Sequence, residues 1–397
     1  MRLPDRRVRA ATAVLAAFGL VLGVTGCSLD EDQTSRSVAG WTHLHPGGSD
    51  IEAVVTVSGN PSVVYTTTDS GRPTIFESTD GGGSWTRIAG ESGTWFALLA
   101  VDPRHRKTLF AQRWFQTAGG SISPTGLVKS TDDGRSWTSV NRGLPKDPPE
   151  APSVSALAFA PSGETLYAAS GNGIFRSINA GASWARVYHA PRQVRATAIA
   201  VDPKTPSTLY AGTGPVAQDG VPGIGPVTVL RSTDSGKTWW RTTFHGDSDE
   251  IDGIAIDPHN PRTLYVTASN GFYKSEDHGK RWTRLGLPAG AESSALFPSA
   301  AACSTCPLLA IDPSRPDTVY VSAYDVMTDE SFVLKSTTGG RTWNVVADIK
   351  GQYGESFPLS SLAIDPTGHR VYGGMEFGDL FVCETCWQKT SPRTPRS

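Results

Sequence analysis

One short pattern, Ser-x-Asp-x-Gly-x-(Ser/Thr)-Trp, recurs along most of this 397-residue chain. The tryptophans of this pattern follow one another at intervals of 43 to 61 residues. Trp387 continues the series at the end of a last unit, in which the rest of the pattern is absent. Self-similarity at such a period indicates a repeat architecture, in which each repeat is one supersecondary unit packed against its neighbours. The pattern therefore constrains the fold more than any other feature of the sequence.

Six copies of the pattern are present, and three of them depart from it at one position. Asn179 replaces the aspartate of the third copy, Arg281 the hydroxyl residue of the fifth, and Thr338 the aspartate of the sixth. A catalytic group is needed once, whereas a turn is needed in every unit, so we assign these residues a structural role. The turn residues are Ser78, Asp80, Gly82, Trp85, Ser130, Asp132, Gly134, Trp137, Ser177, Asn179, Gly181, Trp184, Ser232, Asp234, Gly236, Trp239, Ser275, Asp277, Gly279, Trp282, Ser336, Gly340 and Trp343.

Two short apolar segments precede most copies, and the first of them usually ends in Asp-Pro. Val101-Asp102-Pro103 is followed by Thr108-Leu109-Phe110, and Ile256-Asp257-Pro258 by Thr263-Leu264-Tyr265. Asp-Pro followed by polar residues is typical of a hairpin turn. Each unit is therefore predicted to contain four short strands, a to d, and the 42 glycines and 28 prolines agree with many tight turns.

The pattern resembles the Asp-box, or bacterial neuraminidase repeat, and the resemblance covers nearly all of the chain from about residue 41. It implies an all-β fold, a β-propeller with blades of four antiparallel strands and Asp-box turns between strands c and d. The dense repeats are similar to those of sialidases, xyloglucanases, sortilin-type receptors and photosystem II assembly factors. We predict one propeller over residues 41–390 and a flexible tail at 391–397. Seven blades are expected, with eight as the alternative.

The segment Trp41-Thr42-His43-Leu44 resembles a fourth strand, such as Trp85-Thr86-Arg87-Ile88, although it precedes the first complete unit. We expect it to close the ring against the last blade, because closure removes exposed sheet edges. Residues 387–389 form a competing fourth strand, and the sequence does not decide between the two.

The amino terminus resembles a bacterial lipoprotein signal. Four arginines within the first nine residues precede an apolar run over residues 10–22, which is short for a membrane span. Val24-Thr25-Gly26-Cys27 resembles a lipobox, which implies a lipid on Cys27. We expect a signal peptide at 1–26, a lipidated Cys27 and polar tether at 27–40, and a cell-envelope protein anchored on the extracytoplasmic side of the membrane. A plain secretory signal is the alternative, and Sec and twin-arginine export are not distinguished.

Extra residues of the longer units fall in loops between strands b and c or between blades, which open on one face of a propeller. We call it the loop-rich face, and we call the opposite face, which carries the a–b turns and the Asp boxes, the box face. Loops carry most binding functions, so the binding candidates are Arg113, Trp114, Phe115, Arg192, Arg195, Asp219, Tyr324, Asp325 and Tyr353. His43 and His45 alternate along one strand and could share a metal, but packing is the preferred interpretation. No metal and no cofactor are predicted.

Four cysteines besides Cys27 form two Cys-x-x-Cys pairs, Cys303 with Cys306 and Cys383 with Cys386. A zinc site or a thiol redox role is possible for such pairs. We favour two local disulfides, because disulfides persist in exported proteins and because the pairs fall on opposite faces of the predicted ring. The second pair stands where the seventh Asp box is missing, and it is predicted to fasten that turn.

Three functions follow from these features. The first is a non-catalytic binding or assembly module for a protein or glycan partner on the loop-rich face. The second is an Asp-box glycoside hydrolase, sialidase-like or xyloglucanase-like, and the third is a purely structural envelope protein. The Arg-Ile-Pro motif of sialidases is absent. No catalytic residue is assigned, although Asp252, Asp325 and Glu376 are candidates for the two carboxylates that hydrolysis requires.

The charge of the chain bears on its partners. A formal net charge of −2 gives no basic surplus for nucleic acid. The expected partners are therefore the membrane, through the lipid on Cys27, and a protein or glycan ligand. A monomer is expected.

Overall fold

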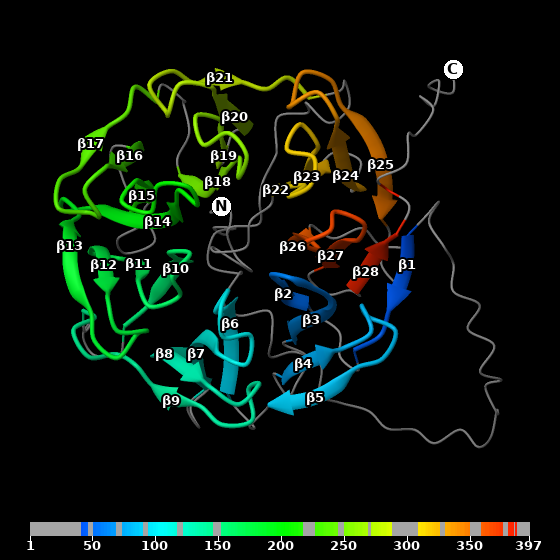
Figure 1. The fold of residues 1–397 in the computed structure, drawn as a ribbon, viewed down its shortest axis with the longest axis horizontal. Helices are drawn as coiled ribbons and strands as arrows, with labels where there is room; N and C mark the ends of the chain where they lie inside the picture. Colours follow the sequence, from blue (N-terminus) through cyan, green and yellow to red (C-terminus); the bar gives the residue numbers. More distant parts are fainter. Residues whose placement is uncertain are drawn as a thin grey trace, which may run out of the picture.

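The computed structural model describes residues 41–46, 51–68, 74–89, 94–116, 122–145, 152–216, 227–244, 250–268, 271–287, 309–325, 330–349, 359–375, 380–384 and 386. These residues form seven four-stranded antiparallel sheets arranged as the blades of a ring (Figure 1). The predicted all-β, seven-bladed propeller is therefore confirmed. The described part of the chain has no helix long and apolar enough to cross a membrane.

Each blade contains strands a to d in order from the centre of the ring outward. Blade one contains β2 (Ile51–Val57), β3 (Asn60–Thr68), β4 (Thr74–Ser78) and β5 (Thr86–Ala89). Blade two contains β6 (Thr94–Val101), β7 (Leu109–Gln116), β8 (Ile122–Ser130) and β9 (Thr138–Ser139). Blade three contains β10 (Val154–Phe159), β11 (Leu166–Ser170), β12 (Gly173–Ser177) and β13 (Ala185–His189). Blade four contains β14 (Val194–Val201), β15 (Leu209–Pro215), β16 (Val229–Ser232) and β17 (Trp240–Arg241). Blade five contains β18 (Ile251–Ile256), β19 (Leu264–Ala268), β20 (Gly271–Ser275) and β21 (Thr283–Arg284). Blade six contains β22 (Leu309–Ile311), β23 (Val319–Asp325), β24 (Glu330–Ser336) and β25 (Asn344–Ile349). Blade seven contains β26 (Leu359–Ile364), β27 (Val371–Met375), β28 (Leu380–Cys383) and β1 (Trp41–Leu44).

The first strand of the chain completes the last blade. In Figure 1 the blue strand β1 lies beside the red strand β28. The two strands pair antiparallel, from Trp41 opposite Cys383 to Leu44 opposite Leu380. The predicted closing strand is confirmed, and the competing segment 387–389 lies outside the described residues.

The hydrophobic core lies between neighbouring blades. One cluster joins Tyr65 and Ile75 of blade one to Leu109 and Val128 of blade two. Apolar side chains of adjacent blades thus exclude water from the seam between them, which is the main force that holds such sheets together. No blade could bury its faces without its neighbours.

Each strand b places one buried aromatic ring in the seam that follows it, and several rings also bond to the next blade. The hydroxyl of Tyr372 donates to the Gly81 carbonyl of blade one at 3.1 Å. In blade two the ring is Phe110, which has no hydroxyl, and Lys129 on the adjacent strand donates instead to Ala180 of blade three at 2.9 Å. The seven rings are Tyr65, Phe110, Tyr167, Tyr210, Tyr265, Tyr320 and Tyr372.

The second Asp box shows what the repeated residues do. The Ser130 hydroxyl donates to Asp132 Oδ1 at 2.7 Å and accepts the backbone N–H of Gly134 at 2.8 Å. The Asp132 carboxylate accepts the hydroxyl of Ser136 at 2.6 Å and its N–H at 2.9 Å. These hydrogen bonds lower the pKa of Asp132 to about 2, and the two bonds from Ser136 have the largest effect. The carboxylate is therefore engaged within its own turn.

The variant boxes preserve the same geometry. The Oδ1 of Asn179 accepts the backbone N–H of Ser183 at 2.9 Å. Thr338 replaces the carboxylate with a hydroxyl, which accepts the N–H of Thr342 at 3.0 Å. Because an amide or a hydroxyl serves as well as a carboxylate, the requirement is for a hydrogen-bond acceptor in a turn, not for catalytic chemistry.

Candidate functional site

A cluster of charged side chains lies at the loop-rich ends of the inner strands of blades four and five. Asp252 is the extra residue of a β-bulge in β18, where the pairing with β19 shifts between Ile251 and Gly253. Thr197 occupies the same position in β14, between Ala196 and Ala198. Bulges change the direction of one side chain and are frequent beside functional sites. The sequence had marked Asp252 without indicating this geometry.

In blades four and seven the bulge residue bonds to the next blade. The hydroxyl of Thr197 donates to the carbonyl of Ile251 in the next blade at 2.6 Å. The hydroxyl of Ser360 in blade seven donates in the same way to Ile51 of blade one. In blade five the bulge holds a carboxylic acid, Asp252, as it does in blade one, where the extra residue is Glu52.

Asp252 is a poorly solvated acid. Burial, reinforced by the negative charge of Glu250, raises its pKa from 3.8 to about 7, and the charge of Arg195 opposes this only in part. Its Oδ2 atom is buried and has no hydrogen-bond partner within the described part of the chain. A buried polar atom of this kind costs stability, and a carboxyl with such a pKa can exchange a proton near neutral pH.

An ion pair joins the two blades beside this acid. Arg195 Nη2 lies 2.7 Å from Glu250 Oε2, and the side chains are 36% and 15% exposed. Gly214 on β15 makes room for this glutamate, because a Cβ on Gly214 would lie 2.8 Å from the Glu250 side chain. The cluster therefore places a cation, an anion and a protonatable acid together at the loop-rich ends of the two inner strands.

Blade two contributes aromatic side chains to the same face. Phe115 lies near the loop-rich end of β7 and is 45% exposed, while Trp114 beside it is half-buried. The neighbouring Arg113 donates from Nε to the hydroxyl of Thr125 at 2.9 Å within the same hairpin. Arg113 thus stabilises the hairpin, and Phe115 is the exposed group.

The structure brings together only some of the predicted site residues. Arg195 and Asp252 meet, whereas Arg192 is exposed in the turn before β14. Glu250 was not singled out as a site residue, and its only signal was an acidic stretch before an inner strand. Tyr324 and Asp325 end β23 at the loop-rich face, and their side chains are not described. The remaining predicted site and lipidation residues lie outside the described part: Cys27, Asp219, Cys303, Cys306, Tyr353 and Glu376.

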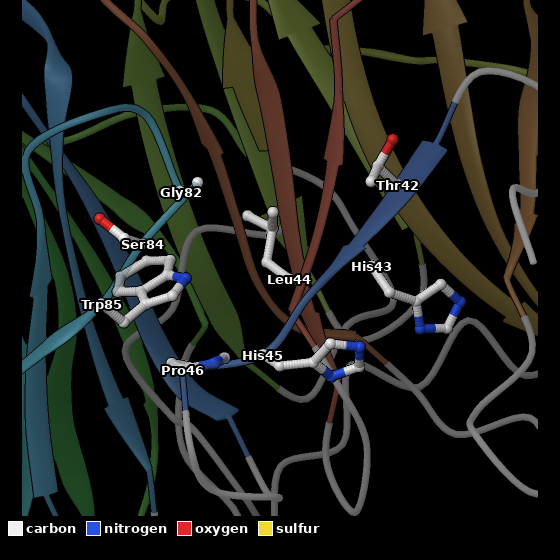
Figure 2. Close-up of a pocket in the computed structure, with 9 residues that line it drawn as sticks. Thr42, His43, Leu44, His45, Pro46, Gly82, Ser84 and Trp85 are labelled. Atoms are coloured by element: carbon white, nitrogen blue, oxygen red, sulfur yellow. The ribbon is translucent and has the colours of Figure 1, made fainter. Parts of the chain in front are cut away.

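His43 of β1 and His45, just after this strand, line a pocket of about 540 Å³ between β1 and the Asp box of blade one. Figure 2 shows both rings on the same side of the strand, with Leu44 pointing the other way, toward Gly82. The ring centroids of His43 and His45 are 6.2 Å apart, and His43 packs edge-on against Phe381 at 4.3 Å. Within the described residues no three His, Cys, Asp or Glu side chains are grouped to hold a metal ion.

A disulfide takes the place of the missing seventh box. Cys383 and Cys386 are bonded, with their Cα atoms 5.6 Å apart. Cys383 is paired with Val371 at the end of β28, as Ser78 is paired with Val64 in blade one. The carbonyl of Cys386 accepts the hydroxyl of Tyr320 at 3.2 Å, which parallels the bond from Tyr372 to blade one. The disulfide therefore presents the same seam acceptor as an Asp box.

The ring, its box turns and its inner-strand bulges define the protein as an Asp-box β-propeller. No protein-family model matches the chain. In sequence it is similar to a xyloglucanase of Paenibacillus sp, with 25% identity over 361 residues that cover 77% of this chain and 33% of the relative. It is also similar to the xyloglucanase Xgh74A of Acetivibrio thermocellus, with 34% identity over 96 residues, 22% of this chain and 11% of the relative. The chain spans a third or less of the length of the curated relatives that it matches.

Solved structures share the whole ring. YCF48 from Cyanidioschyzon merolae has a TM-score of 0.57 and 14% identity, and the match covers 87% of this chain and 99% of that one. A structure of YCF48 bound to D1 peptide has a TM-score of 0.55 and 14% identity, covering 88% and 98%. At this level of identity the similarity establishes the fold alone.

Proposed function

We propose that this protein is a non-catalytic binding or assembly module that holds a protein partner on its loop-rich face. The observation that carries the proposal is the combination, on that face, of an exposed Phe115 with the partly exposed Arg195–Glu250 pair. Aromatic side chains and arginine are enriched in protein interfaces, where they supply most of the binding energy. A solvent-accessible ion pair adds specificity through charge complementarity.

The comparisons support a protein partner. A propeller of the same fold has been solved with a bound peptide, and it matches this chain over nearly the entire ring. A glycan is the alternative ligand for the same face, since Phe115 and Trp114 could also stack on sugar rings.

Two substitutions on the loop-rich face test the proposal. Phe115→Ser and Arg195→Glu are each expected to weaken a partner recovered by crosslinking in the native organism by at least ~10-fold, as expected for interface hot spots. Ile178→Thr is the matched control, because Ile178 is 67% exposed on the box face and four other boxes have threonine at that position. Equal recovery by all three variants would place the partner elsewhere and reject this proposal.

Asp252 favours a second candidate function, an Asp-box glycoside hydrolase. A carboxyl with a pKa of about 7 could serve as a general acid, and the sequence relatives are xyloglucanases. Incubation of the protein with xyloglucan oligosaccharides separates the two functions. Turnover that is abolished in Asp252→Asn and retained in Phe115→Ser would establish the hydrolase; absence of turnover in the wild type leaves the binding module.

We also propose that the module is anchored to the extracytoplasmic side of the membrane through a lipid on Cys27. The support is the sequence pattern of residues 1–27. Cys27→Ser is expected to move most of the exported protein from the membrane fraction to the soluble fraction, because two acyl chains are needed for stable anchoring. An unchanged membrane fraction would contradict the anchor and leave the partner site untouched.

A further inference from the structure

A groove lies on the opposite side of the molecule from the proposed partner site, in the seam between blades four and five. Strand β17 of blade four forms one wall, and the Asp-box turn of blade five forms the other. Its volume is about 230 Å³. Eight residues line it, and none of them has a carboxylate: Arg231, Trp240, Arg241, Thr242, Thr243, His278, Gly279 and Lys280. The side chain of Arg241 lies on the opposite face of the sheet from Trp240, toward blade three, because Arg241 is paired with Leu230.

Trp240 is the feature of this groove that the scaffold does not require. It follows the box tryptophan directly, and it is 52% exposed. The other six blades have a small residue at this position, namely Thr42, Thr86, Thr138, Ala185, Thr283 and Asn344. Since six blades form the same strand without a large side chain there, packing of the ring does not explain an exposed indole.

A cation stands beside the indole in the same row of the sheet. Arg231 is paired with Tyr210 on one side and with Trp240 on the other. Its guanidinium carbon lies 5.9 Å from the Tyr210 ring centroid. Its buried Nε, like Nδ1 of His278 across the seam, has no hydrogen-bond partner among the residues that the structure describes. The Arg231 side chain as a whole is only partly buried and lines the groove, so its guanidinium can be reached from there.

The groove is formed by the fold and does not depend on a ligand. The indole N–H of Trp282 donates to the hydroxyl of Thr242 at 3.3 Å. The hydroxyl of Thr243 donates to the carbonyl of Lys280. These two bonds cross the seam below the exposed side chains and fix the two walls relative to each other.

We propose that this groove binds an acidic carbohydrate. One sugar ring would stack on Trp240, and its carboxylate or sulfate would accept hydrogen bonds from the guanidinium group of Arg231 and the ammonium group of Lys280. Guanidinium groups bind such anions bidentately, and no carboxylate is among the described residues that line the groove. A sugar ring has a flat face of C–H groups that fits an exposed indole, whereas the side chain of an aspartate or glutamate has no such face. An acidic carbohydrate therefore fits the groove better than an acidic peptide.

Titration of the full-length protein with an oligogalacturonate tests this inference. We expect saturable binding, a change in tryptophan fluorescence, and at least ~10-fold weaker binding of a neutral galactose oligomer of the same length, since loss of a charge-assisted pair costs about that much. Trp240→Thr and Lys280→Ala introduce residues that other blades carry at these positions, such as Thr283 and Ala182. Each is expected to weaken binding at least ~10-fold and to leave the thermal unfolding midpoint unchanged.

Lys237→Ala is the matched control. Lys237 has the same position as Lys280 one blade earlier, where Ala185 takes the place of the indole, and binding should be unchanged. The inference is overturned if neutral and acidic sugars bind equally well, or if Trp240→Thr binds with wild-type affinity. It is also overturned if neither an oligogalacturonate nor a sulfated oligosaccharide shows saturable binding. It is also overturned if a glutamate-rich peptide binds more tightly than both sugars.

Discussion

Trp41→Ala is expected to lower the free energy of unfolding by about 3–5 kcal/mol, the range for removing a fully buried aromatic side chain. Trp41 is 0% exposed in the cluster that also contains Phe381 and Cys386. Its indole N–H donates to the carbonyl of Val346 in blade six at 3.1 Å. The substitution therefore leaves a cavity and an unpaired carbonyl at the point where the two ends of the ring meet. Chemical denaturation monitored by circular dichroism measures the loss.

The exposed tryptophan of blade four provides the control for this prediction. Trp240→Thr removes the same side chain from the surface, where substitutions usually change stability by less than about 0.5 kcal/mol. A loss in Trp41→Ala no larger than that in Trp240→Thr would mean that closure by β1 contributes little to the stability of the ring. A loss confined to Trp41→Ala agrees with closure by the amino-terminal strand.

Asp252→Asn is expected to stabilise the protein at pH 8 and to leave its stability nearly unchanged at pH 4. The folded state holds the Asp252 proton up to a pKa of about 7, whereas the unfolded chain releases it near 3.8. The folded state therefore binds more protons in this window, so this group's contribution to stability falls as the pH rises from about 4 to about 7. At about 1.4 kcal/mol for each pKa unit, the difference at pH 8 reaches at most roughly 4 kcal/mol.

The measurement is the difference between the unfolding free energies of variant and wild type at several pH values. Taking the difference cancels the contributions of the box carboxylates, which both proteins share. Glu276→Gln is the control, because this carboxylate is 69% exposed and its difference should be flat between pH 5 and pH 8. If the difference in unfolding free energy between Asp252→Asn and the wild type does not change with pH, ionisation of Asp252 does not destabilise the folded state. The cluster would then not be a strained site of the kind expected for function.

Residues that repeat were predictable from the sequence, because each copy confirms the others. The spacing of the box tryptophans indicated the units, and the likeness of residues 41–44 to a fourth strand indicated the closure that β1 and β28 form. The geometry around Asp252 was not predictable in this way. Burial and the charge of Glu250, two residues before it, raise its pKa, whereas Arg195, from another blade, opposes the rise.

The groove at Trp240 shows the same division. The sequence shows that this tryptophan replaces a small residue found in the other blades. Its position opposite Arg231, and across a seam from His278 and Lys280, follows only from the register of β16 and β17 and the packing of blade five.

The sequence by itself determined the repeating unit, its four strands and its turn chemistry, because these depend on local hydrogen bonds and on a pattern present many times. It left two segments as candidates for the closing strand, and the pairing of β1 with β28 decided between them. The tertiary structure alone decided which single-copy side chains meet. Arg195 with Glu250, and Trp240 with Lys280, come from different blades, and their proximity is set by how the blades pack around the ring. Burial and neighbouring charge, which give Asp252 its proton affinity, exist only after that packing.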